Sequence, residues 1–201
     1  MRILTAAALA ATLGLAACSQ SPAEPPLDGS WTLDGDASHM AFVTVKAGQV
    51  AEAHKFGGLS GSVSDTGEAQ LVVDLASVDT AIDVRNERMR EMLFNVPEFP
   101  RATVTTTLDP ATFADLKTGE TLTQPVTATL DLHGASSEIT TDLSVSRMGA
   151  NTVRVSTVAP IIVAADAYGL GEGVEALREV ANLESITGQV PVTFSLTFVK
   201  Q

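Results

Sequence analysis

Apolar and polar residues alternate along most of this chain, and this period of two constrains the possible folds more than any other feature. The longest run lies near the C-terminus, where one face carries Val190, Val192, Phe194, Leu196 and Phe198. A proline and small polar residues occupy the other face. Such alternation is typical of an antiparallel strand that has one face buried and one face in water.

The same alternation recurs upstream in shorter runs that are bounded by turn-forming residues. It predicts strands at residues 31–34, 40–46, 56–64, 68–75, 103–108, 126–132, 139–145 and 153–156. We expect about eight antiparallel strands, with a turn at Gly35-Asp36 and further turns at 133–136 and 149–151. A sheet of this size tends to close on itself, because closure removes its edges. The sequence therefore predicts an all-β fold, an antiparallel barrel.

Two segments, residues 83–94 and 173–183, break this alternation. Both are rich in helix formers and place apolar residues on one helical stripe, such as Met89, Met92 and Leu93 in the first segment. We expect one or two short helices across the openings of the barrel. The glycine-rich stretch 57–61 lacks the lysine of a phosphate-binding loop, and we interpret it as a strand bend.

The N-terminal residues have a different character and predict export. Residues 1–18 combine Arg2, an uncharged apolar stretch and the run Leu15-Ala16-Ala17-Cys18, which looks like the lipobox of bacterial lipoproteins. Cys18 is the only cysteine, so it has no intramolecular disulfide partner and is the expected lipid-attachment site. An ordinary signal peptide with a stray thiol is the alternative. Residues 19–29 are predicted to form a disordered tether, and residues 30–201 the barrel domain.

Charge and histidine spacing exclude several classes of function. The net charge of −12 excludes a basic nucleic-acid surface and predicts repulsion from acidic phospholipids, so membrane contact is expected through the anchor alone. His39, His54 and His133 are far apart and outside any zinc-binding pattern, and we interpret each as a surface or turn residue, with no metal site. No nucleophile motif occurs either. The sequence predicts a protein that is not an enzyme.

Four groups of residues, taken in order, resemble the signatures of a known family. They are Trp31-x-Leu33-Asp34 with Ser38 and Phe42; Val78-Asp79-Thr80 with Arg85, Met92-Leu93-Phe94 and Glu98-Phe99-Pro100; Leu130-x-Leu132-His133-Gly134; and Asp166-Ala167-Tyr168-Gly169-Leu170. From about Trp31 to Val199 the chain resembles the YceI-like family. The resemblance implies a lipocalin-like barrel around an elongated pocket that binds polyisoprenoids, quinones or fatty-acid-like lipids, without catalysis or a metal cofactor.

The apolar residues of the predicted strands have two interpretations. They either fill a packed barrel or line a slot for a long apolar ligand, and the low aromatic content, 4%, slightly favours the slot because few bulky side chains are available to fill it. The expected lining residues are Phe42, Phe56, Val73, Phe94, Val104, Leu130, Leu132, Leu143, Val145, Val155, Phe194 and Leu196.

Arg85 and Arg88 are the candidates for binding a ligand headgroup at the mouth of the slot. A solvated helix face is the equally weighted alternative. The family pattern usually continues with an acidic residue and a histidine after the arginine. This chain has Arg85-Asn86-Glu87-Arg88-Met89 instead, which leaves the headgroup specificity open.

Two classes of function remain from the sequence. The first is an envelope lipoprotein that carries or stores a long apolar ligand, a lipid or an isoprenoid quinone, while facing the periplasm. The alternative is a ligand-free envelope scaffold, or a partner of a membrane redox protein. Ser19 follows Cys18 where inner-membrane lipoproteins commonly have aspartate, which slightly favours the outer membrane by resemblance.

Overall fold

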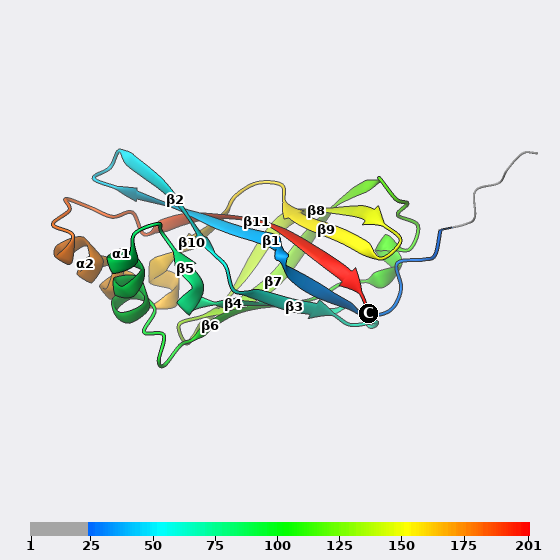
Figure 1. Ribbon diagram of the computed structural model, residues 1–201, viewed down its shortest axis with the longest axis horizontal. Helices are drawn as coiled ribbons and strands as arrows, with labels where there is room; N and C mark the ends of the chain where they lie inside the picture. The colour runs from blue at the N-terminus through cyan, green and yellow to red at the C-terminus, as the bar shows by residue number, and fades with distance from the viewer. Residues whose placement is uncertain (1–23) are drawn as a thin grey trace, which may run out of the picture.

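Eight antiparallel strands form a closed barrel in the computed structural model, which describes residues 24–201 (Figure 1). The hydrogen-bonded ring runs β1–β3–β4–β6–β7–β8–β9–β11 and closes because β11 also pairs with β1. The ring strands are β1 (Trp31–Lys46), β3 (Leu59–Val63), β4 (Glu68–Asp74), β6 (Arg101–Thr107), β7 (Thr121–Leu132), β8 (Ala135–Gly149), β9 (Thr152–Thr157) and β11 (Gln189–Lys200). The predicted all-β fold is confirmed. Residues 1–23, with Cys18 and the predicted signal peptide, lie outside the described residues.

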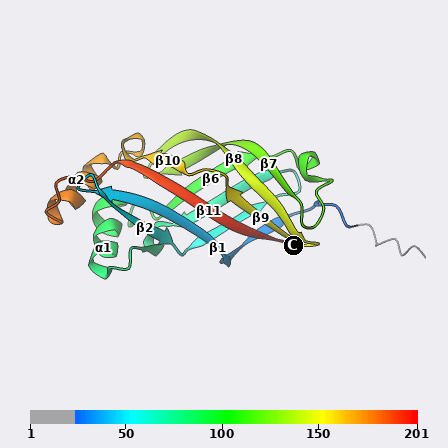
Figure 2. The ribbon, with the colours of Figure 1, turned by 90° about the horizontal axis from the view of Figure 1, so that it is seen from above.

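Three further strands extend the barrel at one end. The second half of β1 continues beyond β3 and pairs with β2 (Val50–Phe56), which pairs in turn with β5 (Val78–Asp79). The first residues of β11 pair with β10 (Ile161–Ala164). These additions lengthen the barrel along its axis, and Figures 1 and 2 show an elongated molecule.

The turn predicted at Gly35-Asp36 is wrong, because β1 is one continuous strand. The pairing of β1 with β11 shifts register between Asp34 and His39, so the strand is irregular there. The Ser38 hydroxyl donates to the Asp34 carbonyl at 2.6 Å and accepts from the backbone N–H of Thr197 at 2.9 Å. These bonds keep the irregular segment attached to β11, so the chain bends without leaving the barrel.

The strand predicted at 56–64 is also corrected. It begins at Leu59, and the Gly57-Gly58 step before it separates β3 from β2, which the sequence analysis did not predict. A Cβ atom at Gly58 would lie 2.8 Å from the Cβ of Asp74, so glycine permits the close crossing there. This position agrees with the bend expected for the glycine-rich stretch. The short strand β10 was missed as well.

Two helices cover the extended end of the barrel, as predicted (Figure 1). The first comprises α1 (Asp83–Arg88) and a π-helical turn, η2 (Met89–Leu93), closed by a 2.9 Å bond from the Phe94 N–H to the Met89 carbonyl. The second is α2 (Gly171–Val180), which starts and ends slightly earlier than expected. The remaining helical turns are η1 (Leu75–Ser77), η3 (Pro110–Phe113) and η4 (Ala165–Tyr168). We call this helix-covered end the mouth.

The opposite end of the barrel is closed by packed side chains around Arg147, which is 2% exposed. Its guanidinium donates to the carbonyls of Pro25 (2.6 Å), Leu116 (2.9 Å) and Gly149 (3.2 Å). Residues 24–29, the part of the expected tether that the structure describes, lie against this end, where Leu27 is buried. The chain therefore enters the domain at the end opposite the mouth (Figure 1).

Candidate ligand-binding site

An apolar cavity of about 540 Å³ extends from the mouth into the barrel. Its volume lies within the range of about 300–1,000 Å³ that is usual for small-molecule sites. All but one of the residues predicted to line it do so: Phe42, Phe56, Val73, Phe94, Val104, Leu130, Leu132, Leu143, Val155, Phe194 and Leu196. The structure thus brings together residues from most strands of the ring and from the helix-covered mouth.

Val145 is the exception among the predicted lining residues. It shares the inward face of β8 with Leu143, but it lies beyond the cavity in the packed core. There it pairs with Leu122 of β7 and Val155 of β9. Alternation identified its face correctly but not its depth, because side chains fill the barrel toward the closed end.

Alternation along the strands explains why the wall of the cavity is apolar. On β7, the even-numbered residues from Val126 to Leu132 line the cavity, whereas Thr127 and Asp131 point outward and are exposed. The small side chains of Ala69, Ala102 and Ala128 leave the middle of the barrel unfilled. Open space therefore remains where larger residues would have made a packed core.

The mouth adds apolar residues that the strand pattern did not identify. Met89 and Leu93 come from the α1–η2 helix, and Val174, Leu177 and Val180 from α2. The sequence indicated these residues only as the apolar stripes of two predicted helices. The tertiary structure shows that both stripes face the same cavity.

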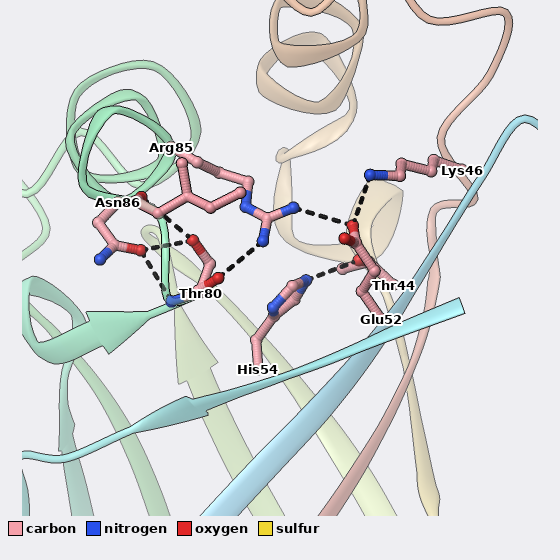
Figure 3. A network of polar contacts seen from close by, with 8 residues as sticks. Thr44, Lys46, Glu52, His54, Thr80, Arg85 and Asn86 are labelled. Carbon is pink, nitrogen blue, oxygen red and sulfur yellow. Dashed lines mark hydrogen bonds and ion pairs between the residues drawn. The ribbon is translucent and has the colours of Figure 1, made fainter. Parts of the chain in front are cut away.

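A network of polar contacts, the mouth cluster, interrupts this apolar wall (Figure 3). It consists of Thr44, Lys46, Glu52, His54, Thr80, Arg85 and Asn86. Arg85 donates from Nη1 to Glu52 Oε2 at 2.9 Å and from Nη2 to the Thr80 carbonyl at 2.8 Å. Lys46 Nζ lies 2.9 Å from the same Glu52 oxygen. Hydrogen bonds from Lys46 and then Arg85 lower the pKa of Glu52, although burial opposes them.

Asn86 fixes the position of the helix that carries Arg85. Its side-chain oxygen accepts from the N–H and the hydroxyl of Thr80 at 2.8 and 2.7 Å. Asn86 is itself buried. The Asn86 residue that departs from the family pattern after Arg85 is therefore a structural anchor, and it holds the Thr80 carbonyl where Arg85 binds it.

His54, expected at the surface or in a turn, is buried instead, with 6% of its area exposed. It comes from β2, and its ring lies beside Phe42, with the ring centroids 5.2 Å apart. Its Nε2 lies 2.9 Å from Thr44 Oγ1. The other two histidines fit the expectation, because His39 is exposed and His133 lies in the β7–β8 turn.

The two headgroup candidates both line the mouth but differ in their surroundings. Arg85 is held inside the mouth cluster, whereas Arg88 makes no ion pair with any other residue in the range 24–201. A group of three or more metal-ligating side chains is absent from the part of the chain that the structure describes. Among residues 24–201, no helix is both long and apolar enough to span a bilayer.

Comparison with known proteins identifies the family. The model of the YceI-like domain matches residues 31–198. The chain belongs to the YceI-like family. A solved structure of a polyisoprenoid binding domain from Saccharophagus degradans, implicated in plant cell wall breakdown, is 45% identical, with a TM-score of 0.83 over 85% of this chain and 98% of that one.

A second similar solved structure is more distant. BcnA from Burkholderia cenocepacia is 21% identical and has a TM-score of 0.64 over 82% of this chain and 98% of that one, which supports the fold alone. Comparison with curated protein sequences found no match. The YceI-like assignment therefore rests on the family model and on the S. degradans domain.

Proposed function

We propose that this YceI-like protein is a binding protein, not an enzyme, that holds a long apolar chain ending in a polar headgroup, such as a polyisoprenoid, a quinone or a fatty-acid-like lipid. The observation that carries the proposal is the open apolar cavity that leads to the mouth cluster. The tail lies along the barrel, and the headgroup lies near Arg85 and Arg88. The similarity to a polyisoprenoid binding domain supports the same ligand class.

Burial of the chain supplies the binding energy. Each 100 Å² of apolar chain removed from water stabilises the complex by about 2.5 kcal/mol, and a prenyl chain exposes several hundred Å² in water. A preformed cavity keeps the cost of ordering the protein small. We therefore expect micromolar or tighter binding.

The first experiment is native mass spectrometry of residues 19–201, followed by organic extraction of any bound compound. Every strand of the ring lies between Trp31 and Lys200, so this chain contains the whole barrel. A stoichiometric prenyl or acyl adduct is the expected result. A ligand-free mass that stays unchanged after incubation with quinones, polyprenols and fatty acids would refute the proposal and favour the scaffold interpretation.

Two matched variants on β7 test whether the cavity is the site. Ala128→Phe adds a ring on the cavity-facing side, and Thr127→Phe adds the same ring on the exposed side. We expect Ala128→Phe to lose the ligand while the barrel remains folded by circular dichroism, and Thr127→Phe to retain it. Equal ligand loads in the two folded variants would place the ligand elsewhere.

We further propose that the protein is attached to a bacterial envelope membrane through Cys18 and carries or stores its ligand in the periplasm. Glu24 lies at the closed end, where its carboxylate is 3.7 Å from Arg147 Nη1. An anchor six residues before it would therefore direct the mouth away from the anchoring membrane. Metabolic labelling with an alkyne fatty acid tests the anchor. Label should enter the wild type and be lost in Cys18→Ala, and label retained by that variant would exclude the anchor.

A further inference from the structure

The charges that line the cavity are opposite in sign to the net charge of the chain. The chain has 24 acidic and 12 basic residues. The charged residues that line the cavity are one acid, Glu52, and three cations, Lys46, Arg85 and Arg88. They come from β1, β2 and the α1–η2 helix, which meet at the mouth. Three cations and one anion leave a positive excess there, in a chain whose net charge is −12.

The ionisation states of the mouth cluster preserve this excess. Hydrogen bonds from Lys46 and then Arg85 lower the pKa of Glu52, so its carboxylate is ionised at neutral pH. Burial is the main cause that lowers the pKa of His54, and the ring is therefore uncharged at neutral pH. Glu52 lies 2.9 Å from both Lys46 and Arg85 (Figure 3). Arg88 makes no ion pair with any other residue in the range 24–201.

The acidic residues of the two mouth helices do not cancel the excess inside the cavity. All of them are exposed and none lines the cavity: Asp83, Glu87, Glu91, Glu172, Glu175 and Glu179. Water and dissolved ions screen exposed charges. A charge beside an apolar wall is screened less, because the effective dielectric constant is lower there. The lining residues therefore dominate the potential that a ligand headgroup experiences at the mouth.

We propose that the mouth selects an anionic headgroup, a carboxylate or a phosphate monoester, and that Arg88 binds it. A guanidinium presents two parallel N–H donors to such a group. Lys46 and Arg85 remain paired with Glu52 and contribute positive charge nearby. The inference deepens the proposed function and rests on it, because the apolar chain must lie in the cavity. It favours an acidic prenyl lipid or a fatty acid over an uncharged quinone.

The first test compares four ligands that share one tetraprenyl chain: the phosphate monoester, the carboxylate, the alcohol and the amine. Equilibrium dialysis against residues 19–201 at low salt, below the critical micelle concentration of each ligand, gives the four affinities. We expect both anions to bind about tenfold more tightly than the alcohol, the value of one charge-assisted hydrogen bond at a half-exposed site. The cationic amine should bind most weakly. Anions that bind no more tightly than the alcohol would overturn the inference.

A matched pair of variants tests the assignment to Arg88. Arg90 lies two residues further along the same helical segment, but it does not line the cavity, and it donates to the Ala76 carbonyl at 3.5 Å. Arg88→Gln should weaken both anions by about tenfold and leave the alcohol unchanged. Arg90→Gln removes the same charge and should change none of the affinities. Circular dichroism checks that both variants are folded. Equal losses in the two variants would assign the anion preference to overall charge and overturn the role of Arg88.

The salt dependence of the wild type gives a readout that needs no variant. Raising the ionic strength from about 0.01 M to about 1 M shortens the Debye length roughly tenfold. The affinity for both anions should then fall toward that of the alcohol, whereas the affinity for the alcohol should not fall. An anion preference that is insensitive to salt would contradict the electrostatic argument.

The two proposals fail in different ways. If all four ligands bind equally, and Arg88→Gln has no effect, the apolar-chain function stands and the headgroup inference falls. If no tetraprenyl ligand binds, the proposed function fails and the headgroup inference fails with it.

Discussion

Replacing Arg147 with methionine should destabilise the barrel without changing its affinity for ligand. Methionine preserves much of the length of the side chain but removes every donor. The guanidinium bonds the carbonyls of Pro25, Leu116 and Gly149 at 2.6, 2.9 and 3.2 Å. Arg147 does not line the cavity, so its loss acts on the closed end alone.

The loss of unfolding free energy depends on whether each of the three carbonyls finds another hydrogen-bond donor once Arg147 is replaced. The bond to the Leu116 carbonyl is buried, so this acceptor remains unpaired, at a cost of about 1–3 kcal/mol. The other two bonds are partly exposed, and water can replace the donor there at about 0.5 kcal/mol each. The variant no longer has to remove a charged guanidinium from water, and this gain offsets part of the loss. We expect a net loss of about 1–3 kcal/mol, or a Tm lowered by about 2–12 °C for a domain of this size.

Urea unfolding at fixed protein concentration measures this loss. The matched control is Arg154→Met, because Arg154 is exposed on the neighbouring strand β9, and it should change the free energy of unfolding by less than about 0.5 kcal/mol. A loss below about 1 kcal/mol in Arg147→Met, or one equal to that of the control, would refute the argument that buried carbonyls at the closed end depend on this side chain.

Three further variants test individual parts of the structure. Because burial lowers the pKa of His54, the unfolded chain takes up a proton at this residue before the folded chain does as the pH falls below about 6.5. Urea unfolding at stepped pH should therefore show the free energy of unfolding decreasing below this pH. The decrease should be smaller in His54→Gln and as large as in the wild type in His39→Gln. Gly134→Ala should cost about 1–2 kcal/mol, since φ is +79° and the new Cβ would lie 3.0 Å from a Phe99 ring carbon. Asn86→Leu should cost about 1–3 kcal/mol by thermal unfolding, because two donors of one threonine lose their acceptor.

A variant that matches the wild type would contradict the corresponding prediction. A pH profile of His54→Gln identical to that of the wild type would mean that another group sets the acid sensitivity. Gly134→Ala at wild-type stability would mean that the two-residue turn between β7 and β8 relaxes at no cost. Asn86→Leu at wild-type stability would mean that the helix carrying Arg85 is held by its apolar contacts alone.

The sequence by itself determined the class of fold and the inward face of most strands. Period-two alternation is a local property of the backbone, because successive side chains of a strand point to opposite sides. It therefore identified Leu130 and Leu132 on β7 and Phe194 and Leu196 on β11 without knowledge of their neighbours. The four family signatures added the elongated pocket inside that barrel, which no local pattern could supply.

Tertiary structure decided what local patterns do not contain. Whether Val145 borders open space or packed core depends on the side chains that seven other strands bring to that depth. The mouth cluster brings Arg85 to Glu52 on β2, a strand that the sequence analysis missed. His54 of the same strand is buried beside Phe42 of β1. Volume and hydrogen bonding are sums over residues distant in the chain, so only the folded barrel reveals the cavity and the polar network at its mouth.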